Sequence, residues 1–323
     1  MSLEKGAIIA VKDCMNVKKG EMVVVVTDTT MEKIGNALFK AAVDMKSDAV
    51  LVKMLPRSRH GEEPPKTVAE IMKVADVVLA PTKYSLTHTQ ARKQATSKGA
   101  RVATLPDITE EMMSSGGMTA DFKKIEKRIK RIHKIVKNAK VAKLTTKLGT
   151  DLTLSLEGRK WIIDDTGICH KKGQYTNLPA GEIFIAPVEG SAKGKVVVDG
   201  SFLETPLKHP VSVFIKEGYA YRFEGGEAAK RVKAVLVDAA RSTKDKRGPY
   251  NVAELGIGMN DKAKIIGNVL EDEKSLGTVH IGFGDNSTYG GKIRAGIHLD
   301  GIIKEATLEI DEKVILKDGK LVI

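Results

Sequence analysis

The first 120 residues alternate short apolar runs with segments of helical periodicity. The run Glu21–Thr27 is rich in β-branched residues, which is typical of a strand buried on both faces of a parallel sheet. Thr29 and Glu32 then stand at the spacing of a capping box, which predicts a helix beginning at Met31. The alternation continues, and it predicts strands over 49–55, 76–80 and 101–105 and helices over 67–74 and 87–98. Strands separated by helices indicate an α/β domain with a Rossmann-like parallel sheet.

A long amphipathic helix is predicted over 121–138, with a lysine-coated outer face. Its apolar positions recur at helical spacing: Phe122, Ile125, Ile129, Ile132 and Val136. From about Lys140 the pattern changes to period two, which predicts β-strands interrupted by one helix near 226–239. These patterns divide the chain into an α/β domain over 1–139, which ends in the basic helix, and a β-rich α+β domain over 140–323.

The composition excludes several classes of protein. The chain has 323 residues, of which 42% are hydrophobic and 29% charged, as in an ordinary soluble globular protein. Its apolar runs fall short of the roughly 18 residues that span a bilayer, and the segment around Glu4 and Lys5 does not read as a signal peptide. We therefore expect a cytoplasmic protein without membrane association. The two cysteines, Cys14 and Cys169, are too far apart for a zinc ribbon, an iron–sulfur cluster or a disulfide scaffold.

The positive charge raises the question of a nucleic-acid partner. The formal net charge is +12, from 53 Lys+Arg and 41 Asp+Glu. Much of this excess lies in the helix predicted over 121–138, and only 4% of residues are aromatic, too few to suggest a base-stacking platform. We therefore expect a solvated helix face and no nucleic-acid partner. The turn after the first strand lacks the glycines of a dinucleotide-binding loop, so no such cofactor is expected.

Metal-ligand residue types gather in the second domain. His280 ends a short apolar strand, and His298 and Asp300 lie two positions apart, so in a strand their side chains would point to one face. Two histidines and a carboxylate suit a divalent metal with open positions. Glu182 and Glu254 lie among small and apolar residues, where a carboxylate must be paired, metal-bound or neutralised. Although a His-x-Asp pair alone is more often structural, these segments together predict a metal site.

His88 is the candidate of the first domain. With Thr89 it stands at the start of a predicted helix after a strand, where open α/β sheets expose ligand-binding loops. Helix capping would explain the same position equally well. The polar segment around Cys169 and His170 is interpreted as structural.

The second domain resembles the thermophilic metallopeptidase family of aminopeptidase T and aminopeptidase S, which includes leucyl aminopeptidase-like proteins, in a short form. The resemblance rests on four strings that occur in the same order, Asn177–Pro187, Ala253–Gly256, Glu271–His280 and Gly296–Asp300. It covers the first domain more loosely, through the α/β layout and the string Ser85–Thr89.

This resemblance implies a two-metal aminopeptidase that removes N-terminal residues from peptides through a metal-activated water. It implies that two zinc, cobalt or manganese ions are held by Glu182, Glu254, His280, His298 and Asp300. It also implies a homodimer. Peptide hydrolysis is favoured because Glu182 and Glu254 supply the carboxylates that a second ion needs, and His88 is a further catalytic candidate.

A related short-form enzyme, the iron-dependent 2,5-dihydroxypyridine 5,6-dioxygenase, has similar motifs. The aminopeptidases carry a tyrosine ligand where this chain has Ser287, and Tyr289 is out of register. Similarity to the dioxygenase implies a single Fe(II) held by His280, His298 and Asp300, with His88 or Glu182 placed for proton transfer on a small aromatic substrate. A non-enzymatic scaffold or RNA-associated role rests only on the net charge.

Overall fold

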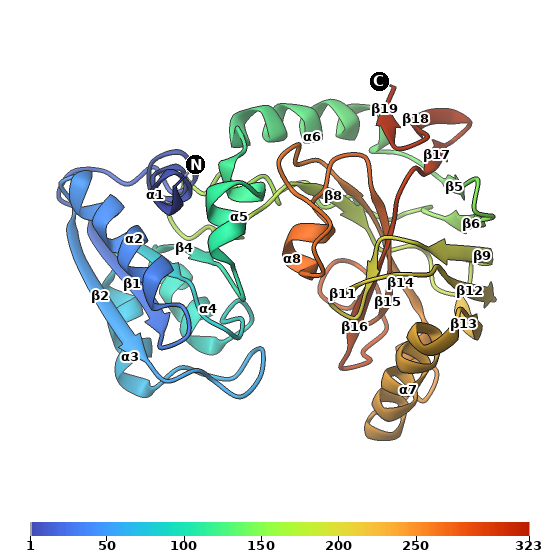
Figure 1. Cartoon of the computed structure of the whole chain (residues 1–323), viewed down its shortest axis with the longest axis horizontal. Coiled ribbons are helices and arrows are strands. Elements are labelled where there is room, and N and C mark those ends of the chain that lie inside the picture. The colour runs from blue at the N-terminus through green and yellow to red at the C-terminus, as the bar shows by residue number, and fades with distance from the viewer. Residues whose placement is uncertain (1, 323) are drawn as a thin grey trace. The chain divides into compact units, whose positions relative to one another are not determined.

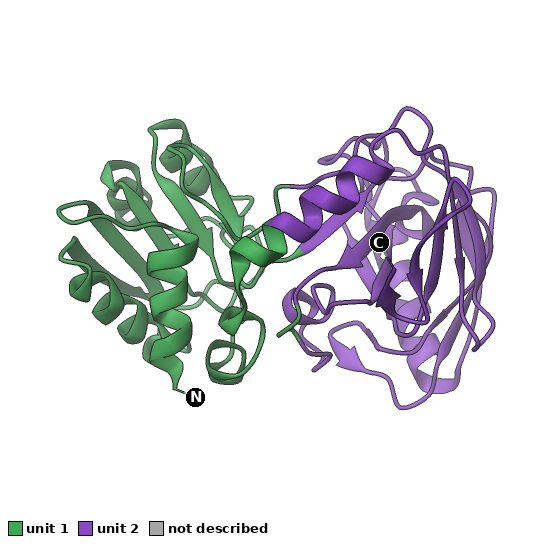
Figure 2. Cartoon of the chain, turned by 90° about the horizontal axis from the view of Figure 1, so that it is seen from above, with its two compact units in different colours: residues 1–126, 164–181, 261–263 green, residues 127–163, 182–260, 264–323 purple. Residues whose placement is uncertain are grey.

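The computed structural model describes residues 2–322 as two compact units, coloured separately in Figure 2. Unit 1 comprises Met1–Glu126, Asp164–Gly181 and Asp261–Ala263, and unit 2 comprises Lys127–Ile163, Glu182–Asn260 and Lys264–Ile323. The hydrophobic pattern does not predict that the short segments 164–181 and 261–263 belong to unit 1. The boundary expected after residue 139 stays a prediction about domain organisation. None of the helices within 2–322 has both the length and the apolarity to cross a membrane.

Unit 1 is built on a five-stranded parallel sheet in the order β2-β1-β3-β4-β7. Figure 1 labels its strands β1, β2 and β4. Its strands are β1 (Met22–Asp28), β2 (Asp48–Met54), β3 (Val77–Ala80), β4 (Arg101–Thr104) and β7 (Tyr175–Asn177). Its helices are α1 (Leu3–Ile8), the π-helix η1 (Ile9–Cys14), α2 (Glu32–Asp44), α3 (Lys66–Val74), α4 (Gln90–Ser97), α5 (Glu110–Ser114) and the 3-10 helix η2 (Gly117–Thr119). The α/β arrangement predicted from the alternation is confirmed.

Alternate residues of the parallel strands pack against helices on opposite faces. Val24, Val78 and Val102 form one apolar cluster with Met72 of α3 and Ala95 of α4. On the other face Gly35 of α2 lies so close to Thr27 that a Cβ on this glycine would be 2.8 Å from the threonine Cβ. The sheet is therefore covered by helices on both faces, which explains the continuous apolar character of β1.

Helix α6 (Phe122–Val136) has the amphipathic character expected over 121–138. All five apolar positions predicted for its inner face are at most 2% exposed. Lys123, Lys124 and Lys127 are exposed, as is Lys130. The division between the two units falls within this helix.

Unit 2 contains two larger antiparallel sheets and a two-stranded ribbon. The eight-stranded sheet has the order β13-β12-β9-β6-β5-β17-β18-β19, and the four-stranded sheet has the order β16-β15-β14-β8. The first is formed by β5 (Val141–Thr145), β6 (Asp151–Ser155), β9 (Lys193–Val198), β12 (Val211–Lys216), β13 (Tyr219–Glu224), β17 (Thr307–Ile310), β18 (Lys313–Lys317) and β19 (Lys320–Leu321). The second is formed by β8 (Glu182–Ile185), β14 (Val252–Gly258), β15 (Val279–Gly284) and β16 (His298–Ile303), and the ribbon by β10 (Ser201–Phe202) and β11 (Thr205–Pro206).

Besides the part of α6 from Lys127 on, the described helices of unit 2 are α7 (Gly226–Ser242), α8 (Val269–Asp272) and the 3-10 helix η3 (Gly248–Tyr250). The period-two pattern and the single long helix expected after Lys140 are thus confirmed. The four-stranded sheet carries the candidate metal ligands.

Candidate metal centre

One face of the four-stranded sheet collects all five predicted ligands. Residues paired across antiparallel strands project to the same side, and so do alternate residues along each strand. The cross-strand pairs on this face are Glu182 with Gly258, Gly256 with His280, Glu254 with Gly282, Gly282 with Asp300, and Gly284 with His298. The intervening odd-numbered residues of β8, β14 and β15, such as Ile183, Leu255 and Ile281, are fully buried. One face is therefore apolar core, and the other carries carboxylates and imidazoles.

Glycines on the ligand face make room for the imidazole rings. A Cβ at Gly256 would overlap the ring of His280. A Cβ at Gly282 would be 2.8 Å from Cε1 and Nε2 of His298 and 2.8 Å from Cβ of Glu254. The glycines that bracket the predicted ligands therefore form the space in which the ligand atoms converge.

His298, Asp300 and Glu254 form the first cluster of donor atoms. Nε2 of His298 lies 3.1 Å from Oδ1 of Asp300 and 3.5 Å from Oε2 of Glu254. The other ring nitrogen, Nδ1, lies 2.9 Å from the carbonyl oxygen of Asp285. Because a carbonyl only accepts hydrogen bonds, Nδ1 carries the proton in the neutral ring, which leaves the lone pair of Nε2 for a metal.

His280 links this cluster to Glu182. Its Nε2 lies 3.2 Å from Oε1 of Glu254 and 3.2 Å from Oε2 of Glu182, and the ring is completely buried. Among the described residues, Nδ1 of His280 has no hydrogen-bond partner. Buried polar atoms are ordinarily satisfied, so an incompletely hydrogen-bonded histidine beside two carboxylates fits a metal-binding group.

Two further residues of the site were not predicted. Glu273 and Lys274 follow α8, and Nζ of Lys274 lies 2.5 Å from Oε1 of Glu182 and 2.6 Å from Oε1 of Glu273. Within the segment 271–280 the sequence predicts only His280 as a ligand. A Glu-Lys pair beside a ligand strand was the available signal, and it is too common on protein surfaces to be decisive.

The electrostatics of the site are those of crowded carboxylates. Burial opposes charge on His298, but Asp300 and Glu254 outweigh burial and raise the pKa of His298 to about 10. For His280 the carboxylates of Glu182 and Glu254 likewise outweigh burial, and its pKa is well above the usual value. Burial raises the pKa of Glu273 to about 8. Each proton or ammonium ion here stabilises negative charge that a divalent metal would also stabilise.

The donor atoms fit a divalent ion. Glu182, Glu273 and His280 contribute one group of atoms within 4.8 Å of one another, and Glu254, His298 and Asp300 contribute another. Imidazole and carboxylate donors suit zinc, iron and manganese. The five predicted ligands lie together as expected, and their assignment as ligands stays a proposal.

Tyr289 and Ser287 take different positions around His298. The hydroxyl of Tyr289 donates to the Asp285 carbonyl at 2.9 Å and lies 3.2 Å from Nδ1 of His298. Ser287 donates to Oδ1 of Asp285 at 2.8 Å and stabilises the turn. The loop after β15 therefore contacts His298 at Nδ1.

His88 belongs to unit 1, whereas the five expected ligands belong to unit 2. It is exposed on the loop before α4. Its neighbour Thr89 caps this helix by accepting a hydrogen bond from the Arg92 amide at 3.2 Å, so capping explains Thr89. The role of His88 stays a prediction. Cys169 and His170 also lie in unit 1, where they bond to main-chain carbonyls of Cys14 and Asp13.

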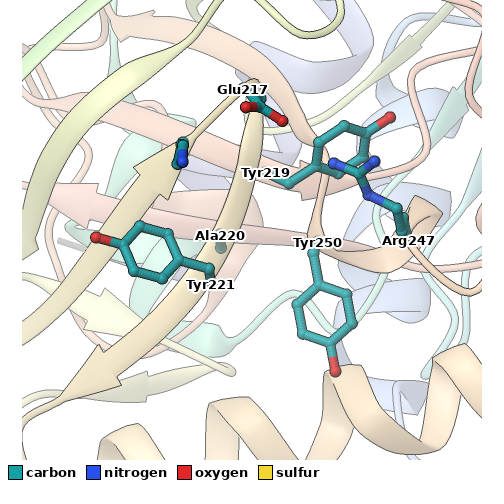
Figure 3. Close-up of a pocket in the computed structure, with 7 residues that line it drawn as sticks. Glu217, Tyr219, Ala220, Tyr221, Arg247 and Tyr250 are labelled. Atoms are coloured by element: carbon teal, nitrogen blue, oxygen red, sulfur yellow. The ribbon is translucent and has the colours of Figure 1, made fainter.

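Two cavities elsewhere in unit 2 contain none of the five ligands. One, of about 360 Å³, is lined by Tyr219, Tyr221 and Tyr250, and the guanidinium of Arg247 stacks over Tyr219 at 4.1 Å (Figure 3). The other, of about 660 Å³, lies between the β10–β11 ribbon and the start of α7.

Known proteins are similar to the chain over most of its length. The model of the 2,5-dihydroxypyridine 5,6-dioxygenase family matches residues 8–323. The 2,5-dihydroxypyridine 5,6-dioxygenase of Pseudomonas putida KT2440 is 23% identical over 267 residues, which are 78% of this chain and 72% of that protein. The solved structure of 2,5-dihydroxypyridine dioxygenase from the same organism has a TM-score of 0.81 at 18% identity, and covers 99% of this chain and 96% of its own. AmpT from Thermus thermophilus has a TM-score of 0.70 at 16% identity, with 99% of both chains covered.

These similarities correct the function expected from the sequence. The family match overturns peptide hydrolysis by a two-metal aminopeptidase, so this expectation was wrong, and the likeness to AmpT is one of fold alone. The match supports an enzyme and a divalent metal such as Fe(II). Because the family model spans residues 8–323, the chain belongs to the 2,5-dihydroxypyridine 5,6-dioxygenase family.

Proposed function

We propose that the chain is a mononuclear Fe(II) dioxygenase that opens a dihydroxypyridine-like aromatic ring. The observation that carries the proposal is the family match over residues 8–323. The convergence of two imidazoles and a carboxylate on one sheet face supports it, because two histidines and one carboxylate are the ligand set of non-haem Fe(II) oxygenases.

His280, His298 and Asp300 would hold the ion. The carbonyl of Asp285 fixes the tautomer of His298, and the space opened by Gly256 admits the ring of His280. A ferrous ion at this position supplies a redox centre with open coordination positions. Glu254 lies within 3.5 Å of Nε2 of both histidines, the nitrogens proposed to bind the ion, so its carboxylate would lie beside the ion.

Proton transfer needs a base that is charged at neutral pH. Burial opposes ionisation of Glu182, but Lys274 and His280 outweigh burial and lower its pKa. Glu182 would therefore accept a proton from a ring hydroxyl, and His88 is the second candidate for this step. The proposed substrate is a small dihydroxylated nitrogen heterocycle. A cytoplasmic homodimer remains the expected state.

The test is a combined metal and oxygen measurement on anaerobically purified protein. We expect about one iron per chain after reconstitution, and oxygen consumption with 2,5-dihydroxypyridine in equal molar amounts, accompanied by loss of aromatic absorbance. Hydroquinone, which lacks the ring nitrogen, is the matched control substrate. An iron-loaded protein that leaves 2,5-dihydroxypyridine and oxygen unconsumed would overturn the proposal.

A further inference from the structure

Lys274 lies at the position where a second metal ion would be expected. Its side chain is only 3% exposed, although burial of an ammonium ion is costly unless it is paired. Two carboxylates pair it, Glu182 at 2.5 Å and Glu273 at 2.6 Å.

The same two carboxylates form a complete ligand group with His280. Their donor atoms lie within 4.8 Å of one another, as do those of Glu254, His298 and Asp300. His280 lies between the two groups, with Nε2 at 3.2 Å from both Glu182 and Glu254. The sheet and the loop after α8 therefore provide two adjacent three-donor groups, which is an arrangement suited to a pair of divalent ions.

We propose that Lys274 makes this centre mononuclear, because its ammonium replaces a second divalent cation between Glu182 and Glu273. This inference rests on the proposed function for the first ion. The ammonium and a metal ion compete for the same lone pairs, because a first-row metal lies about 2.0–2.2 Å from a carboxylate oxygen. A second ion would also face the positive charge of Lys274 at short range, where like charges repel strongly in a dry interior.

The position of Lys274 changes the role of Glu182. A carboxylate that accepts a hydrogen bond from an ammonium ion is held in a fixed orientation and remains negatively charged. Glu182 is thereby removed from the ligands of the first ion and becomes available as a proton acceptor. The carboxylates that suggested two ions from the sequence are thus consistent with one ion and one lysine.

The experiment counts metal ions in wild-type protein and in the variant Lys274→Met. Methionine has an unbranched side chain of similar length to lysine but carries no charge. Each protein is loaded with Mn²⁺ and analysed by elemental analysis and by electron paramagnetic resonance. We expect about one ion per chain in the wild type and about two in the variant, with the signal of an exchange-coupled pair. The coupled signal separates a neighbouring second ion from manganese bound elsewhere.

Matched variants locate the second ion. Lys274→Arg keeps the positive charge and should stay at one ion, and Lys304→Met removes a half-exposed lysine and should also stay at one. Adding Glu182→Gln to Lys274→Met should return the count from two to one. Lys274→Gln is measured in parallel, so that a folding defect of the methionine variant, detected by circular dichroism, does not decide the result.

Two results would overturn the inference: two ions in the wild type, or folded Lys274→Met and Lys274→Gln proteins that still bind one. Failure of the proposed function would look different. In that case the wild type would consume no oxygen with 2,5-dihydroxypyridine, whether or not the ion count rises in the variants.

Discussion

Glu254 and Asp300 lie in one cross-strand row of the four-stranded sheet, with Gly282 between them. Two carboxylates with only a glycine separating them repel each other unless cations lie close by. The imidazole of His298 lies within 3.5 Å of both carboxylates. Positive charge is therefore needed beside Glu254 and Asp300. His298 lies there, at the centre of the proposed iron site.

Replacement of His298 by alanine should abolish iron binding while the fold persists. The side chain is 29% exposed at the edge strand β16, so its removal leaves little cavity in the core. Changing the outer hydrogen-bond partner of a ligand reduces metal affinity by about 10–100-fold. Loss of the ligand itself should reduce iron affinity by more than this. Elemental analysis and circular dichroism measure both effects. His209→Ala, at an exposed position, is the control, and full iron content in His298→Ala would contradict the ligand assignment.

Tyr289→Phe should weaken iron binding by about tenfold, the lower end of the range for an outer hydrogen-bond partner. The hydroxyl contacts Nδ1 of His298, but the Asp285 carbonyl still fixes this nitrogen after the change. Titration of the apoprotein with Fe²⁺ under nitrogen gives the affinity, and Tyr250→Phe is the matched control. A loss as large as that of His298→Ala would show that Tyr289 itself binds the metal.

Gly256→Ala should displace His280 and lower both iron content and stability. The added Cβ would overlap the imidazole, and overpacking of this kind costs about 1–3 kcal/mol. Urea denaturation gives the free energy of unfolding. Gly248→Ala is the control, because a Cβ there would be 3.3 Å or more from its neighbours. Unchanged iron content and stability would mean that the ring of His280 does not occupy this space.

The sequence predicted those parts of the site that depend on strand periodicity. His298 and Asp300 share a strand, so their convergence follows from a spacing of two, and the glycines mark where rings fit against the backbone. Glu273 and Lys274 lie on a loop after α8, where no period relates sequence position to direction in space. The sequence did not predict that Lys274 lies beside Glu182. For this reason the carboxylates of Glu182 and Glu254 suggested a second ion.

The prediction of the fold was likewise limited to elements that have a local signal in the sequence. The apolar runs and helical periods of the first 120 residues are local signals, and their elements formed where expected. The capping box of Thr29 and Glu32 did not form, because Met31 precedes α2 without a side-chain hydrogen bond and Glu32 pairs with Lys53 of β2. The three-residue strand β7 has no apolar run, and its pairing with β4 defines it.

The stability of unit 1 should decrease in acid through Glu21. Arg101 is buried and bonds both Glu21 oxygens, at 3.1 and 2.7 Å. Burial would raise the pKa of Glu21, but Arg101 and the Lys18 amide outweigh it and lower the pKa below 4.5. A carboxyl with a lower pKa in the folded state stabilises the fold above its unfolded pKa. This stabilisation is lost as the pH falls through the folded value.

Glu21→Gln should therefore lower the free energy of unfolding by about 1–3 kcal/mol at neutral pH. The difference from wild type should shrink as the pH falls through the lowered pKa of Glu21. Urea denaturation followed by circular dichroism gives both values. Glu70→Gln removes an exposed pair with Lys73 and should lower the free energy of unfolding by less than Glu21→Gln does. A difference for Glu21→Gln that grows in acid would contradict the role given to this pair.

The parallel sheet of unit 1 can be completed only after strand β7 has been synthesised. Tyr175–Asn177 pairs with β4, although β5, β6 and the whole of α6 come between them in the chain. Until these three residues leave the ribosome, the main-chain groups of β4 on that side have no strand beside them. An open strand edge is a template for association with other chains. The nascent protein thus passes through a stage in which most of unit 1 exists but one edge of its sheet is still unprotected.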